Sequence, residues 1–118
     1  MKKIILCCLL SLSFSFSAAA EDGQALYTGL CSGCHKLVPP PTIAPPFFGI
    51  KKNLLRTLPE RDAFVNFVVD YVNKPDAAKS LMPDAVARFK LMPALPYPEA
   101  KVRAVAEFIY DTDLFSVK

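Results

Sequence analysis

The sequence has a single histidine, His35, and only two cysteines beyond its first eight residues, Cys31 and Cys34. A structural zinc site needs four ligands, almost always from cysteine and histidine. Outside its N-terminal segment this chain has three such side chains. It could therefore build a zinc site only by recruiting carboxylates.

Other patterns are missing as well. No stretch alternates apolar and polar residues for long enough to predict a β-strand, and no internal repeat or low-complexity tract is present. No stripe of basic residues points to nucleic acid. These absences favour a single all-α domain that does not bind nucleic acid.

The N-terminus has the layout of a secretory signal peptide. A short basic region, Met1–Lys3, is followed by an apolar run over residues 4–16 and by small residues up to Ala20. A membrane-spanning helix needs about 20 apolar residues, so the run is too short to be an anchor. We expect cleavage after Ala20, which removes residues 1–20 with Cys7 and Cys8 and leaves a mature domain of residues 21–118.

The mature domain is predicted to consist of helices. A short helix is expected over Asp22–Leu30, with Asp22 as its N-cap, and a C-terminal helix over Pro98–Asp111. Between them, one helix is expected from about Pro59 to Pro75, and Asp76–Lys90 offers one or two turns broken at Pro83. The apolar stripes that predict the two longer helices are Phe64, Phe67, Val68, Tyr71 and Val72, and Val102, Val105, Ala106 and Ile109.

Two proline-rich segments are predicted to be loops. Val38–Phe48 contains five prolines, which remove amide donors and fix φ, so it cannot be a helix. Leu91–Glu99 is broken by prolines in the same way. Long irregular connections in a small domain usually wrap something or carry function.

Cys31, Ser32, Gly33, Cys34 and His35 form a Cys-x-x-Cys-His motif, the attachment signal of c-type haem. Two thiols at this spacing can form thioethers with the two vinyl groups of one porphyrin. The adjacent histidine is then held at the iron. Such attachment takes place outside the bacterial cytoplasm, which agrees with the predicted signal peptide.

The same two cysteines leave other interpretations open. They could form a thiol–disulfide pair, although a thioredoxin-like motif expects a βαβ context that the sequence lacks. They could also form an incidental structural disulfide. A zinc site is the least favoured alternative because ligands are scarce.

Beyond the motif, nearly all of the mature chain resembles the class I c-type cytochromes. Gly23 and Tyr27 precede Cys31 by eight and four residues, as in the N-terminal helix of that family. The resemblance implies that this helix crosses the C-terminal helix closely at Gly23 and meets Phe108 there. It also implies the class I cytochrome c fold, with three main helices and short helical turns wrapped around one covalent haem c.

The resemblance further implies the surroundings of the iron. The family has a proline about ten residues after the haem-binding histidine, and Pro45 is expected to accept a hydrogen bond from the other ring nitrogen of His35. As no second histidine exists, the sixth ligand is expected to be Met92, in a Met-Pro sequence shortly before the C-terminal helix. Met82, a weaker ligand such as lysine, and an open site are the alternatives.

A shell of aromatic residues is expected to exclude water from the haem, although some of them must simply be core. These residues are Phe47, Phe48, Phe64, Phe67, Tyr71 and Phe89.

The expected function is that of a periplasmic, His/Met-ligated electron carrier that is not an enzyme. With both axial positions filled, one-electron outer-sphere transfer between redox proteins is favoured. The alternatives are a dedicated cytochrome subunit of a periplasmic dehydrogenase and a haem-free thiol–disulfide protein. The protein is expected to be a monomer or to form transient complexes, without a transmembrane anchor after cleavage.

The mature charge gives little information about partners. Without Lys2 and Lys3, 12 of the 14 basic residues remain against 11 acidic ones, a net charge near +1. Four lysines flank the expected haem loops and are either a rim that steers acidic partners or a solvated surface. They are Lys36, Lys51, Lys52 and Lys90.

Overall fold

The computed structural model describes residues 21–116, so the predicted signal peptide lies outside the described residues. Within this range the chain is helical and contains no strand, which confirms the all-α prediction. The helices are α1 (Gly23–Leu26), α2 (Phe47–Thr57), α3 (Arg61–Asn73), α4 (Pro83–Phe89) and α5 (Glu99–Asp111). A π-helical turn over Tyr27–Cys31 continues α1, and a 3₁₀ turn covers Ala77–Lys79.

Local signals account for most helix boundaries. The carboxylate of Asp22 accepts hydrogen bonds from the backbone N–H groups of Gln24 and Ala25, as predicted for an N-cap. Pro98 occupies the N-cap position of α5. Pro83 lies in the first turn of α4, where a missing N–H costs nothing, so it begins a helix rather than breaking one.

The sequence interpretation missed α2. Val38–Phe48 was expected to be non-helical throughout, but its last two residues form the start of this eleven-residue helix. One face of α2 buries Phe47, Lys51 and Leu54. A lysine in the apolar face hides the helical pattern. Residues 21–116 thus contain one substantial helix more than the three expected.

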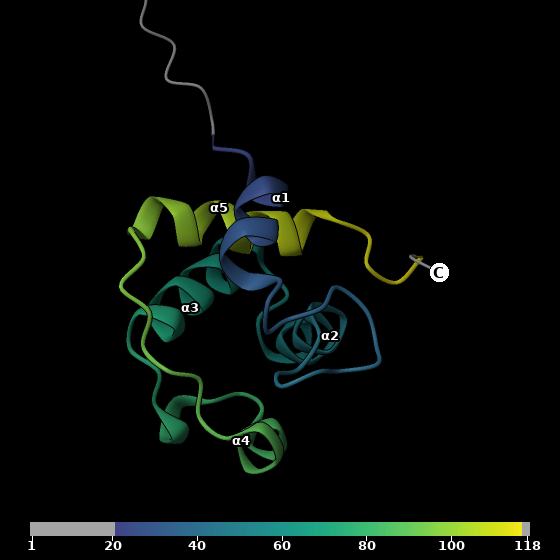
Figure 1. The fold of residues 1–118 in the computed structure, drawn as a ribbon, viewed down its shortest axis with the longest axis vertical. Helices are drawn as coiled ribbons and strands as arrows, with labels where there is room; N and C mark the ends of the chain where they lie inside the picture. The colour runs from purple at the N-terminus through teal and green to yellow at the C-terminus, as the bar shows by residue number, and fades with distance from the viewer. Residues whose placement is uncertain (1–20, 117–118) are drawn as a thin grey trace, which may run out of the picture.

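The core lies around α5, which packs against α3, α1 and α2 (Figure 1). Its buried residues are Tyr27, Phe47, Leu54, Phe64, Val65, Val69, Val102, Val105, Ala106, Ile109 and Leu114. In contrast, α4 buries none of its residues and lies apart from this group. Among residues 21–116, no helix is both long and apolar enough to cross a membrane.

The predicted close crossing of α1 and α5 is present at Gly23. A Cβ at this position would lie 2.7 Å from the Cβ of Phe108 and would also clash with the carbonyl oxygen of Ala104. Just beyond, the rings of Tyr27 and Phe108 stack with centroids 5.9 Å apart. Only glycine lets the two helix backbones approach this closely.

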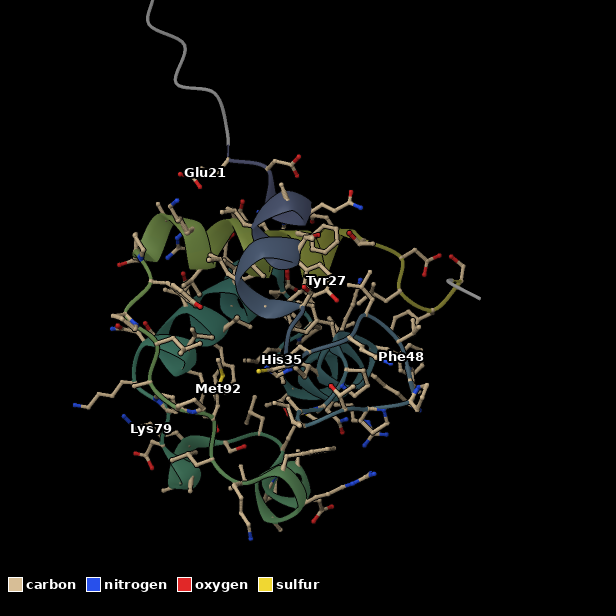
Figure 2. All side chains as sticks on the ribbon, viewed as in Figure 1. Glu21, Tyr27, His35, Phe48, Lys79 and Met92 are labelled. Atoms are coloured by element: carbon tan, nitrogen blue, oxygen red, sulfur yellow. The ribbon has the colours of Figure 1, made fainter. Side chains whose placement is uncertain are left out.

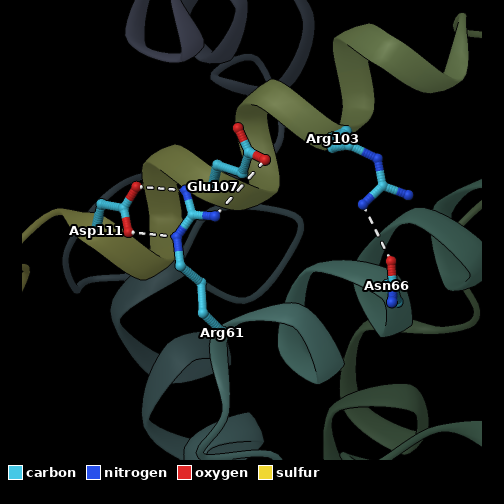
Figure 3. Close-up of polar contacts among 5 residues, drawn as sticks. All are labelled: Arg61, Asn66, Arg103, Glu107 and Asp111. Atoms are coloured by element: carbon cyan, nitrogen blue, oxygen red, sulfur yellow. Dashed lines mark hydrogen bonds and ion pairs between the residues drawn. The ribbon is translucent and has the colours of Figure 1, made fainter.

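Two arginines link α3 to α5 on the exposed surface (Figure 3). Arg61 makes a two-pronged contact with the carboxylate of Asp111, at 3.0 and 2.9 Å, and lies 3.8 Å from Glu107. Arg103 donates a hydrogen bond to the side chain of Asn66 at 3.0 Å. The hydrogen bond from Arg61 holds the pKa of Asp111 below its usual value.

We expect Gly23→Ala to lower the free energy of unfolding by about 1–3 kcal/mol, because the added methyl group forces α1 away from α5. Urea unfolding followed by circular dichroism measures this loss. Gly29→Ala is the matched control, since a Cβ there meets no atom within 4 Å. Equal stability of the Gly23→Ala variant and the wild type would contradict the close crossing.

We expect Arg61→Gln to destabilise the fold only slightly, because the ion pair is exposed. The loss should shrink in concentrated salt. It should also shrink as the pH falls through the lowered pKa of Asp111, because a neutral carboxyl no longer attracts the guanidinium. Urea unfolding at two salt concentrations and several acidic pH values checks this, and a salt-independent loss would argue against an electrostatic origin.

Candidate functional site

Cys31 is the last residue of the π-helical turn, and Cys34 lies in the turn that follows it. Cys31 is half-buried, Cys34 is exposed, and both are free thiols. The backbone N–H groups of Cys34 and His35 donate to the carbonyl of Cys31, at 3.2 and 2.8 Å, which closes a tight turn. Burial, reinforced by Cys34, raises the pKa of Cys31 to about 11. Without a disulfide, both sulfurs remain free to form other bonds.

The imidazole of His35 is held by the backbone. Its Nδ1 lies 2.7 Å from the carbonyl oxygen of Pro45, the contact implied by the resemblance. A carbonyl oxygen only accepts hydrogen bonds, so Nδ1 carries the proton. Burial lowers the pKa of His35 below its ordinary value, although the bond to Pro45 opposes this shift. Burial therefore favours the neutral ring, which carries its lone pair on Nε2 when Nδ1 is protonated.

Backbone hydrogen bonds fix the position of Pro45. The N–H of Phe47 donates to the carbonyl of Lys36, and that of Phe48 to the carbonyl of Leu37, each at 2.8 Å. The first amides of α2, which have no partner within the helix, are thus paired with the chain just after His35. The loop between them is closed at its base.

Two side chains that sequence reasoning did not assign support the motif. The hydroxyl of Tyr27 donates to the carbonyl of His35 at 2.9 Å, and that of Thr42 donates to the carbonyl of Cys34, also at 2.9 Å. Burial raises the pKa of Tyr27, so this hydroxyl keeps its proton. No sequence signal identifies Thr42, because its contact depends on the path of the proline-rich loop.

Met92 lies on the helix-free segment between α4 and α5 and is half-buried. The segment starts at Lys90, whose φ of 72° is rare for a residue other than glycine and turns the chain away from α4. Figure 2 shows Met92 on this segment and His35 beside α2. That these two residues are the axial ligands stays a prediction.

Met82, the alternative ligand, is the N-cap residue of α4 and packs against the hydrophobic core. It also lines a largely apolar pocket of about 330 Å³ between α4 and the proline-rich loop. The other lining residues are Pro39, Pro41, Pro45, Pro46, Asp84, Ala85, Arg88 and Phe89. This placement fits a packing role for Met82.

The expected aromatic shell divides into two groups. Phe47 and Phe64 belong to the buried core, where the ring of Phe47 lies 5.3 Å from that of His35 and Phe64 packs on Tyr110. The remaining members are half-buried: Phe48, Phe67, Tyr71 and Phe89. Among the expected shell residues, Phe47 places its ring next to the imidazole of His35.

The prediction that four lysines form an exposed surface is wrong for Lys51. Lys36, Lys52 and Lys90 are exposed, but Lys51 is only 7% exposed. Its Nζ donates to the carbonyls of Tyr110 and Thr112 at the end of α5. Its charge is therefore used inside the molecule rather than presented to a partner.

No family model matches the chain, and no curated protein or solved structure is significantly similar to it. Among residues 21–116, no three or more histidine, cysteine, aspartate or glutamate side chains converge as a metal-binding cluster.

Proposed function

We propose that the protein is a class I c-type cytochrome, a small monohaem carrier that passes single electrons between redox proteins in the periplasm. The observation that carries this proposal is the state of His35. Its Nδ1–H is bound to the carbonyl of Pro45, and its Nε2 lone pair is available within four residues of two free thiols. A bond of this kind orients a ligating imidazole and raises its basicity toward a metal.

The donor set fits a covalent haem c. Cys31 and Cys34 would carry the thioethers, His35 would be the proximal ligand and Met92 the distal one, with Met82 as the alternative. The bound haem would supply reversible one-electron chemistry. With His35 and Met92 both serving as ligands, the bound group would take up no substrate, and the protein would transfer electrons without being an enzyme.

The packing supports the finer fold assignment. The crossing of α1 and α5 at Gly23 and Phe108 is the one that the cytochrome resemblance implies. The Met92 segment and α4 lie outside the close packing of α1, α2, α3 and α5. A bound haem would add apolar surface for half-buried side chains to contact.

Free diffusion between partners distinguishes this proposal from a dedicated dehydrogenase subunit. The exposed Lys36, Lys52 and Lys90 would offer acidic partners a weak electrostatic attraction rather than a permanent interface. A stable complex that co-purifies with the protein from its native cells would favour the subunit alternative.

Expression of residues 1–118 in a bacterium that attaches haem c should give a red periplasmic protein starting at Glu21. We expect a pyridine haemochrome spectrum of the c type on the denatured protein, and this colour should survive acid–acetone extraction because thioethers are covalent. N-terminal sequencing checks the cleavage after Ala20. A colourless product with two titratable thiols would overturn the proposal in favour of thiol–disulfide chemistry.

Met92→Leu should remove the sixth ligand, alter the visible spectrum and lower the reduction potential sharply, because a methionine ligand raises the potential. Met82→Leu is the matched control and should leave the ligation spectrum intact. Spectra and redox titrations of both haem-loaded variants measure the difference. The reverse result would reassign the distal ligand to Met82.

A further inference from the structure

The acceptor that holds the His35 ring is attached to the start of α2. Pro45 and Pro46 lead directly into this helix, and the first two amides of α2 are bonded to Lys36 and Leu37. The ring of Phe47 also lies beside the imidazole. A shift of α2 would therefore move the carbonyl of Pro45 relative to Nδ1 of His35.

Lys51 connects α2 to the end of α5. It lies one helical turn after Phe47, on the same buried face. Its Nζ donates to the carbonyl of Tyr110 at 2.6 Å and to that of Thr112 at 2.7 Å. Among residues 21–116, these are the only hydrogen bonds between α2 and α5 or the segment that follows it.

A lysine is chemically suited to this place. The last carbonyls of a helix lack partners within the helix and carry partial negative charge, so a cation stabilises them. The ammonium also lies 5.9 Å from the ring centre of Tyr110 and 5.7 Å from that of Phe115, where the ring faces attract it. A methionine would fill similar space but remove the ammonium donor from both carbonyls, leaving that of Thr112 with only the N–H of Leu114.

Of the other helices, α5 is the one that α2 packs against most closely. The first turn of α2 also contacts Tyr27, whose ring centre lies 5.1 Å from that of Phe47. Beyond the end of α5, the ring of Phe115 lies 5.2 Å from that of Phe48, so an apolar contact accompanies the hydrogen bonds of Lys51. Lys51 is thus the residue whose hydrogen bonds hold α2 against the end of α5.

We propose that Lys51 is a positioning residue for His35: by pinning α2 to the end of α5, it keeps the carbonyl of Pro45 within hydrogen-bond distance of Nδ1. It acts through α2 and touches neither the ring nor the bound group. The effect of Lys51 on an iron ligand rests on the proposed function, whereas its effect on the hydrogen bond between His35 and Pro45 does not.

The single histidine makes this link measurable. Labelling with ¹⁵N-histidine gives NMR signals from one imidazole only, so the exchange of the Nδ1 proton with water can be followed without overlap in the reduced, haem-loaded protein. We expect Lys51→Met to speed this exchange by about threefold to tenfold, the range for losing a hydrogen bond with a net value of about 1 kcal/mol. Lys51→Arg, which keeps the donors and the charge, should restore most of the protection.

Two controls separate positioning from a general loss of stability. Lys52→Met removes the same charge from an exposed neighbour and should leave the exchange rate unchanged. Val69→Ala weakens the core on α3 and should lower the free energy of unfolding without exposing the His35 proton. Unchanged exchange in Lys51→Met, or equal acceleration in Val69→Ala at matched stability, would overturn the inference.

Further outcomes remain decisive. If Lys51→Met does not fold, Lys51→Gln, which keeps an uncharged donor, should show an intermediate exchange rate, and a wild-type rate there would overturn the inference. If the wild type is isolated folded but colourless from a host that attaches haem c, the proposed function fails, while the same ring measurement on that protein still decides the role of Lys51. A wild-type chain that neither binds haem nor folds would overturn both.

Discussion

The hydrogen bond from Nδ1 of His35 to the carbonyl of Pro45 is the constraint around which the functional end of the molecule is organised. It fixes the tautomer of the only imidazole in the chain and leaves one nitrogen with a free lone pair. Because the acceptor is a backbone carbonyl, the bond is only as well placed as the main chain that carries it. Much of the remaining structure can be understood as support for that segment.

The support is a chain of contacts between distant parts of the sequence. Tyr27 connects the α1 region to the carbonyl of His35, and the first amides of α2 bind the residues that follow the motif. Lys51 then joins α2 to the end of α5, while Gly23 lets α1 lie directly on α5. Both α1 and α2, which support the imidazole from two sides, are therefore held against α5.

Local signals predicted much of this arrangement. The Asp22 cap, the α5 boundaries and the cysteine–histidine motif are encoded by neighbouring residues, and the resemblance added the Gly23 crossing and the Pro45 contact. The helix α2 was missed because Lys51 interrupts its apolar face. The burial of Lys51 depends on carbonyls 59 and 61 residues away, which no local pattern reveals. The choice between Met82 and Met92 is equally non-local, since both precede a proline.

The proline-rich loop is held by hydrogen bonds at its base, whereas its tip is exposed. Between Lys36 and Phe47 the chain leaves and returns to nearly the same place, and at its tip Ile43 is 68% exposed. Loop closure depends only weakly on length once the ends are held. Apart from Thr42, whose hydroxyl donates to the carbonyl of Cys34, the tip can therefore change in sequence and length while its base keeps the imidazole in place. This makes it the part of the site most open to variation between related proteins.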